Sequence, residues 1–257
     1  PALREIMEKN DYICKLDLKD AYVVVGHHPQ SRKYLTFMNQ GVVYQYKTLA
    51  FGMSVSPRVF SKMMRFEVEQ LRKEGIRFVY YLDDVCLLAK TKEEMSQVSS
   101  RVINHLTSLG FLINQEKSIL TPLHKQEFLG FVFNSVKMKI TVPFKKINKL
   151  ISRIKQALQT QTRSCRWYAS LIGKMTSMIP AIGEALLHIR HLQRDLAHSL
   201  HLHHQRWEAP FLLSNNSRTE LTWWLTYVTD KNGLPIQRID NPTPAIMIHV
   251  DASDIAW

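Results

Sequence analysis

Two adjacent aspartates stand between two short apolar runs, and this feature limits the fold more than any other. The runs cover residues 78–82 and 85–88, and Asp83 and Asp84 separate them. Apolar runs of this length around turn-forming residues predict two strands joined by a tight turn. Adjacent carboxylates repel each other, and the flanking runs carry no Lys or Arg. A divalent cation would relieve that repulsion, and an ordinary Asp-containing turn is the alternative.

A third carboxylate, Asp17, lies on the polar side of another predicted strand. Apolar side chains recur at every second position from Tyr12 to Leu18, so Asp17 points to the opposite face. If this strand lies beside the Asp83-Asp84 turn in one antiparallel sheet, three carboxylates meet. Such a set could hold two hard cations about 4 Å apart, the arrangement used for phosphoryl transfer.

The remaining pattern mixes strands and helices up to residue 142 and is mostly helical after Pro143. Helices are expected from Ser56, as the N-cap before Pro57, and from Thr91, which forms a capping box with Glu94. Ser217 and Glu220 predict another capped helix. Further strands are expected at 34–38, 42–47, 112, 128–133, 139–142 and 245–250. Further helical segments are expected at 147–158, at 164–178 and, after a break at Pro180, up to about residue 202.

Positive charge is concentrated in the helical part. The formal net charge is +12, and residues 137–206 hold 13 Lys or Arg against two Asp or Glu. Counterion release from a nucleic-acid backbone would favour that layout, and a solvated helix face is the alternative. A basic membrane-surface protein is a weaker reading, because no long amphipathic helix carries an aromatic face.

Cysteine usage and hydropathy bear on the compartment. Cys14, Cys86 and Cys165 are odd in number and form no CxxC pair, which argues against a zinc knuckle or a disulfide framework. No apolar run approaches the roughly 18 residues that span a bilayer, and no signal peptide is visible. We therefore expect an intracellular protein of the cytoplasm, the nucleus or both, which is not secreted and has no membrane partner.

Five short motifs stand in order over residues 1–135. They read KLDLKDAY at 15–22, YKTLAFGMSVSP at 46–57, YLDD at 81–84, a fourth motif from Gly110 to Ser118, and FLGF at 128–131. Together they resemble the palm motifs of reverse transcriptases. A lone YxDD is weak evidence, whereas five ordered motifs are specific. Segments 170–174, 188–194 and 220–224 resemble DIRS-type retrotransposons, and gypsy-type elements and plant pararetroviruses are near alternatives.

The resemblance implies an α+β fold and a domain order. Residues 1–135 would form a right-hand polymerase palm, an antiparallel sheet packed on helices, with partial fingers. Residues 136–206 would form a helical, basic thumb, and 207–244 a connection. Residues 245–257 would begin a truncated ribonuclease H domain, where Asp251 is one carboxylate of an incomplete set. The rest of the family's fingers would precede this chain.

The same resemblance assigns roles to site residues. Asp17, Asp83 and Asp84, with the backbone carbonyl of Leu18, would hold two Mg²⁺ ions, or Mn²⁺ instead. Tyr22 would exclude a ribose 2′-hydroxyl, and Lys117 would donate a proton to pyrophosphate, a surface lysine being the alternative reading. The other implied contacts are Phe51 and Gly52 with the nucleotide, and Arg32, Lys33, Leu129, Gly130, Lys145, Lys146, Lys149 and Arg153 with nucleic acid.

The sequence therefore predicts an RNA-directed DNA polymerase of a retrotransposon polyprotein. It would add dNTPs to a primer 3′ end on an RNA or DNA template by two-metal-ion nucleotidyl transfer. The alternative is a non-catalytic nucleic-acid-binding remnant of a decayed retroelement. The intact aspartates argue against decay, since neutral drift would readily lose them.

Overall fold

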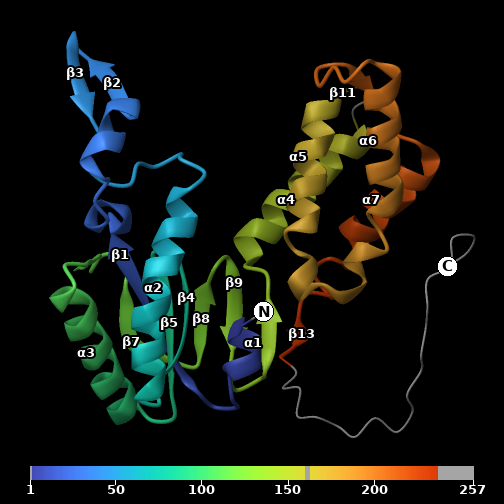
Figure 1. The fold of residues 1–257 in the computed structure, drawn as a ribbon. Helices are drawn as coiled ribbons and strands as arrows, with labels where there is room; N and C mark the ends of the chain where they lie inside the picture. Colours follow the sequence, from blue (N-terminus) through green and yellow to red (C-terminus); the bar gives the residue numbers. More distant parts are fainter. Residues whose placement is uncertain (1, 160–162, 237–257) are drawn as a thin grey trace, which may run out of the picture.

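A central antiparallel sheet positions the rest of the molecule in the computed structural model, which describes residues 2–159 and 163–236 (Figure 1). Five strands form it in the order β4-β5-β1-β6, with β7 also paired to β1. Their bounds are β1 Tyr12–Lys19, β4 Arg77–Tyr81, β5 Asp84–Ala89, β6 Leu112–Ile113 and β7 Ile119–Leu123.

Two amphipathic helices cover one face of this sheet. They are α2, Ser56–Lys73, and α3, Lys92–Ser108. Their apolar stripes, which recur at helical spacing, pack on Cys14, Leu16 and Leu87 of the sheet in one buried cluster. The opposite face of the sheet carries Ile13, Cys86 and Leu88, which belong to a second cluster shared with the rest of the molecule.

A second, four-stranded sheet lies on that opposite face, next to the short helix α1, Ala2–Ile6. Its order is β13-β10-β9-β8, with bounds β8 Lys125–Phe128, β9 Phe131–Asn134, β10 Lys139–Thr141 and β13 Leu234–Pro235. The single strand predicted for 128–133 is wrong. Leu129 and Gly130 both take positive φ angles, of 47° and 79°, so the chain turns there into a hairpin.

Four helices form a bundle beyond this sheet. They are α4 Phe144–Gln159, α5 Cys165–Thr176, α6 Arg190–Leu202 and α7 Asn215–Tyr227. The 3₁₀ turns η3, Ile179–Ala181, and η4, Gly183–Leu186, and the short pair β11 Arg163–Ser164 and β12 Pro210–Phe211 connect them. Trp224 of α7 is fully buried and donates its indole N–H to the His188 carbonyl. The bundle therefore extends past residue 206, the predicted end of the thumb.

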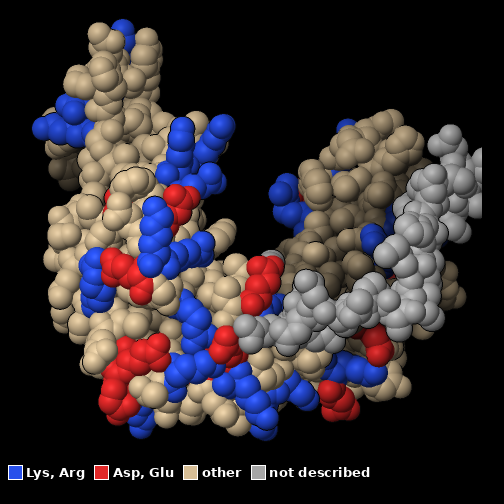
Figure 2. Space-filling model, turned by 60° about the horizontal axis from the view of Figure 1, so that its bottom comes forward, with Lys and Arg blue, Asp and Glu red and all other residues tan. Residues whose placement is uncertain are grey.

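A hairpin stands on the other side of the molecule. It consists of β2, Thr36–Asn39, and β3, Val42–Gln45, and it follows the 3₁₀ turns η1, Ala21–Val24, and η2, Pro29–Tyr34. Every residue of both strands is exposed. A space-filling view shows an open hollow between the part that carries this hairpin and the helical bundle (Figure 2). The arrangement matches the predicted palm, partial fingers and thumb (Figure 1).

The predicted helix caps are correct in one case out of three. Thr91 caps α3, because its hydroxyl accepts the Glu94 N–H at 3.0 Å. Ser56 instead donates its hydroxyl to the Ala50 carbonyl at 2.8 Å and lies inside the first turn of α2. Helix α7 is capped by Ser214, three residues before the predicted Ser217, which lies inside the first turn.

Two expectations concern residues beyond the described part. The predicted strand at 245–250 and the ribonuclease H carboxylate Asp251 lie outside the described residues. Within residues 2–159 and 163–236, no helix combines the length and apolarity that a membrane crossing requires.

Candidate active site

The strand register brings the three predicted aspartates to one end of the central sheet. Asp17 of β1 lies directly opposite Asp84 of β5. The Leu18 N–H donates to the Asp83 carbonyl at 2.8 Å, so the turn is tied to β1 as well. Leu82 takes a positive φ of 55°, which makes the connection between β4 and β5 tight.

Backbone hydrogen bonds hold Asp17 from its other side. Its N–H donates to the Ser118 hydroxyl at 3.0 Å, and its carbonyl accepts the Asn114 N–H at 2.8 Å. Asp17 is 8% exposed, yet it reaches the wall of a cavity rather than an apolar interior. These bonds fix the backbone of Asp17 beside the cavity, and its side chain lies in the cavity wall.

A cavity of about 600 Å³ opens beside the turn. Its wall contains these predicted site residues: Asp17, Leu18, Tyr22, Phe51, Asp83 and Lys117. Asp84 and Gly52 do not line it. Gly52 has a φ of 86°, so it supplies the backbone turn next to Phe51.

Sequence reasoning missed five residues of the cavity wall, which are Lys19, Asp20, Ala21, Leu82 and Asn114. Asp20 carries a usable signal, since it lies within the first motif between Asp17 and Tyr22. It also takes a φ of 49°, a conformation that non-glycine residues adopt rarely. Asn114 lies within the fourth motif, but only the fold brings it to Asp17.

Tyr22 is an aromatic residue of the cavity wall that packs against two other rings. Its ring centroid lies 5.1 Å from that of Phe51 and 5.3 Å from that of Phe60. Burial raises the pKa of its hydroxyl, and the nearby Asp83 and Tyr81 raise it further. The phenol therefore stays neutral at physiological pH, and its position is set by packing.

Asp84 has a partner that the sequence analysis did not foresee. Its Oδ1 lies 2.7 Å from Nζ of Lys15, and the two side chains are 22% and 20% exposed. The runs that flank the motif carry no Lys or Arg, as the sequence shows, so the charge of Asp84 is compensated from elsewhere in the fold. The cation comes from the neighbouring strand β1 and not from the flanks of the motif.

This ion pair changes how the three carboxylates fit a metal. Among the residues that the structure describes, no three His, Cys, Asp or Glu side chains are already arranged to hold a metal ion. Asp17 and Asp83 nevertheless share one cavity wall. Mg²⁺ is commonly held by one or two carboxylates together with substrate phosphates and water. Those two aspartates fit such an ion.

The predicted nucleic-acid contacts fall into two groups on the thumb side. Leu129 and Gly130 form the tip of the β8–β9 hairpin, and Lys146 of α4 donates from Nζ to the Gly130 carbonyl at 2.9 Å. Lys145 and Lys149 are exposed on the same helix. Arg153 differs from them, because it is half-buried and its guanidinium lies 4.8 Å from the Trp167 ring centroid.

The two basic residues expected near the template lie on η2, away from the cavity. Arg32 donates from Nε to the His27 carbonyl at 3.3 Å. Lys33 Nζ lies 5.0 Å from the centroid of the Tyr34 ring. Neither side chain lines the cavity wall, so any contact with substrate would be made at the base of the β2–β3 hairpin.

Comparison with known families agrees with this geometry. The model of the family described as reverse transcriptase (RNA-dependent DNA polymerase) matches residues 2–133, which is half of the chain. The chain belongs to the reverse transcriptase family. The match covers all three aspartates and ends at the second sheet, so the helical bundle lies outside it.

Viral polyproteins are among the relatives of this reverse transcriptase chain. It is 27% identical over 127 residues to the genome polyprotein of Petunia vein clearing virus, covering 49% of the chain and 6% of that polyprotein. It is also 27% identical over 184 residues to the Gag-Pol polyprotein of Walleye dermal sarcoma virus, covering 70% of the chain and 10% of that polyprotein. The chain thus spans about a tenth or less of these relatives.

A solved structure supports the fold over most of the chain. The foamy viral protease-reverse transcriptase, determined in complex with an RNA/DNA hybrid, superposes with a TM-score of 0.70. The match covers 89% of this chain and 28% of that protein at 17% sequence identity. This likeness includes the helical bundle and shows a reverse transcriptase fold.

Proposed function

We propose that this chain carries the polymerase centre of an RNA-directed DNA polymerase. It would add dNTPs to a primer 3′ end on an RNA or DNA template, with Mg²⁺ or Mn²⁺. One observation carries the proposal: Asp17 and Asp83, 66 residues apart in sequence, share a cavity wall with Tyr22 and Lys117. Family membership supports the same reaction, in which charge neutralisation and positioning supply most of the catalysis.

Each residue of the cavity wall would have a role in the reaction that follows from its position. Two bound ions would activate the primer 3′-hydroxyl and neutralise the triphosphate. Asp17 and Asp83, with the backbone of Leu18, would hold them, and the ring of Tyr22 would exclude a ribose 2′-hydroxyl. Lys117, exposed on the cavity wall, would give a proton to the departing pyrophosphate.

The template-primer duplex would lie in the hollow between hairpin and bundle (Figure 2). The tip of the β8–β9 hairpin and the exposed lysines of α4 would contact its backbone, which needs charge but no base readout. The foamy viral enzyme, whose fold this chain shares, was solved with an RNA/DNA hybrid. We further propose that the enzyme works inside the cell, in the cytoplasm, the nucleus or both.

We also propose a DIRS-type retrotransposon as the source of the parent polyprotein. Segments 170–174, 188–194 and 220–224 support this assignment. The genes that flank the chain would decide it. A downstream tyrosine recombinase is expected for a DIRS-type element, whereas a DDE-type integrase would point to a gypsy-type element.

Primer extension on an RNA template tests the polymerase proposal. The double variant Asp83→Asn plus Asp84→Asn should lose extension, because two of the three aspartate charges, including that of the metal-holding Asp83, are lost while the side chains keep their size. Glu93→Gln, an exposed carboxylate on α3, is the matched control and should extend as the wild type does. Extension that survives in the double variant would remove the metal assignment. Wild-type duplex binding with no Mg²⁺-dependent extension would instead favour a non-catalytic remnant.

A further inference from the structure

The ion pair between Lys15 and Asp84 separates the third aspartate from the other two. Lys15 precedes Asp17 by two residues on β1, so both side chains leave the same face of the strand. Lys15 lies opposite Cys86 in the register, so Asp84, two residues before Cys86 on β5, is its diagonal neighbour. The 2.7 Å contact therefore follows from the register of the two strands.

Asp84 depends on this lysine for compensation. Its Oδ1 atom is buried. Among the described residues, Lys15 is the cation within ion-pair distance of this atom, and no other group forms a hydrogen bond with it. Asp17 lies directly opposite on the neighbouring strand, and like charges in that position destabilise a sheet. A half-buried carboxylate next to another carboxylate is costly without a counter-charge. Lys15 supplies that charge within the protein itself.

The same pair explains which aspartates face the substrate. Asp17 and Asp83 line the cavity wall, and Asp84 does not. A divalent ion in that cavity would therefore meet two carboxylates and would complete its coordination with phosphate oxygens and water. Releasing Asp84 would add a third carboxylate to the site and raise its negative charge.

We propose that Lys15 is a positioning residue that holds Asp84 away from the cavity, so that divalent metal is bound by Asp17 and Asp83 together with the nucleotide phosphates. This inference rests on the polymerase function proposed above. It predicts that the chain alone binds divalent ions weakly and that a bound nucleotide strengthens the binding. The charge of Lys15, more than the packing of its methylene stem, sets this behaviour.

A direct titration with Mn²⁺ in the absence of nucleotide, monitored by electron paramagnetic resonance, tests the proposal. Lys15→Met keeps the length of the stem but loses the charge, so Mn²⁺ should bind about tenfold more tightly than to wild type. The metal-free variant should also melt at a lower temperature, and Mn²⁺ should restore much of the loss. Lys15→Arg, which keeps the charge, should bind Mn²⁺ as wild type does. Lys125→Met, an exposed lysine on β8, is the matched control and should change nothing.

The outcomes separate this inference from the proposed function. Unchanged Mn²⁺ affinity in Lys15→Met would overturn the role of Lys15, provided that Asp17→Asn plus Asp83→Asn abolishes binding. Mn²⁺ binding that survives this double aspartate variant would overturn the metal site and the proposed function with it. If Lys15→Met does not fold, Lys15→Gln carries the same expectation, because it keeps a hydrogen-bond donor and loses the charge.

Discussion

Single side chains at the cavity wall have separable effects, and Tyr22 offers the sharpest test. Its ring packs against those of Phe51 and Phe60. Tyr22→Ala should open the wall where a ribose 2′-hydroxyl would enter. We expect the ratio of ribonucleotide to deoxyribonucleotide incorporation to rise by about tenfold or more. Single-nucleotide primer extension with matched rNTP and dNTP series measures this ratio.

The matched control for that prediction is Tyr22→Phe. It keeps the ring and its contacts and removes only the hydroxyl, so discrimination between the sugars should stay near wild type. Equal ribonucleotide incorporation by Tyr22→Ala and the wild type would show that another group excludes the 2′-hydroxyl. A loss of discrimination in Tyr22→Phe would mean that the hydroxyl, and not the bulk of the ring, does so.

At this scale the sequence could predict the aspartates but not their partners. Asp17 and the Asp83-Asp84 turn stand out because polar residues interrupt apolar strands. The link from Lys15 to Asp84 depends on the register of β1 against β5, which joins positions 69 residues apart. Residue types alone do not give a register, because hydrophobic alternation leaves the pairing of distant strands undetermined.

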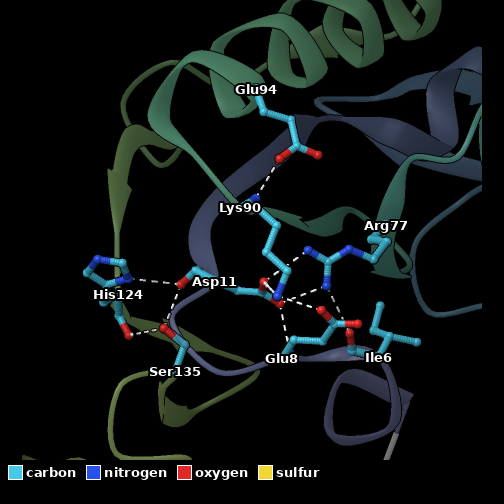
Figure 3. A network of polar contacts seen from close by, with 8 residues as sticks. All are labelled: Ile6, Glu8, Asp11, Arg77, Lys90, Glu94, His124 and Ser135. Carbon is cyan, nitrogen blue, oxygen red and sulfur yellow. Dashed lines mark hydrogen bonds and ion pairs between the residues drawn. The ribbon is translucent and has the colours of Figure 1, made fainter.

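Between elements, a polar network centred on Asp11 ties the central sheet to the second sheet (Figure 3). Asp11 is fully buried and accepts two hydrogen bonds from Arg77 of β4, at 2.8 and 2.9 Å. Lys90, which follows β5, lies 2.8 Å from the same carboxylate. The Asp11 carbonyl accepts from the Ser135 hydroxyl beyond β9. The network therefore joins strands that no single hairpin connects.

The pH dependence of stability should reveal this network. Burial raises the pKa of Asp11, but hydrogen bonds from Arg77 and Lys90 outweigh it and leave the pKa below its ordinary value. A lowered carboxyl pKa stabilises the fold above the unfolded value, near pH 4, and that contribution disappears as pH falls through the folded value. Asp11→Asn should lower the free energy of unfolding by about 3 kcal/mol at pH 7.

Urea unfolding of wild type and Asp11→Asn at about pH 7 and about pH 3 checks this expectation. The difference in free energy of unfolding between the two proteins should be smaller at the lower pH. Glu74→Gln breaks an exposed pair with Arg101 and is the matched control, with an expected loss below about 1 kcal/mol. A difference for Asp11→Asn that stays constant with pH would show that lost packing, rather than charge, causes its effect.

Helices with a strong hydrophobic periodicity were predictable from the sequence. Strands that form only by pairing with a segment distant in the sequence were not. The stripes of α2, α3 and α4 predicted helices close to their observed bounds. Strand β7 was missed, because its residues are exposed or half-buried and Pro122 interrupts it. Strand β13 consists of two residues paired with β10, about 95 positions earlier in the chain. Short strands of this kind are defined by their partner and not by their own pattern.

For the whole molecule, the charge layout makes a prediction about salt. Lys145 and Lys149 are exposed one helical turn apart on α4, within the segment that carries most of the net positive charge. If both contact phosphates of a duplex in the hollow, each releases counterions on binding. The double variant Lys145→Ala plus Lys149→Ala should then reduce the slope of log affinity against log salt by about 2.

A fluorescence titration of a labelled RNA/DNA hybrid over a salt series gives that slope. The matched control is Lys73→Ala plus Lys92→Ala, which removes the same charge from exposed positions at the end of α2 and the start of α3. Lys146 is left in place, because its bond to the Gly130 carbonyl also shapes the β8–β9 hairpin. If the slope decreases equally in both double variants, overall charge governs binding. A loss confined to the α4 variant places the duplex against the helical bundle, because only local phosphate contacts distinguish two proteins of equal net charge.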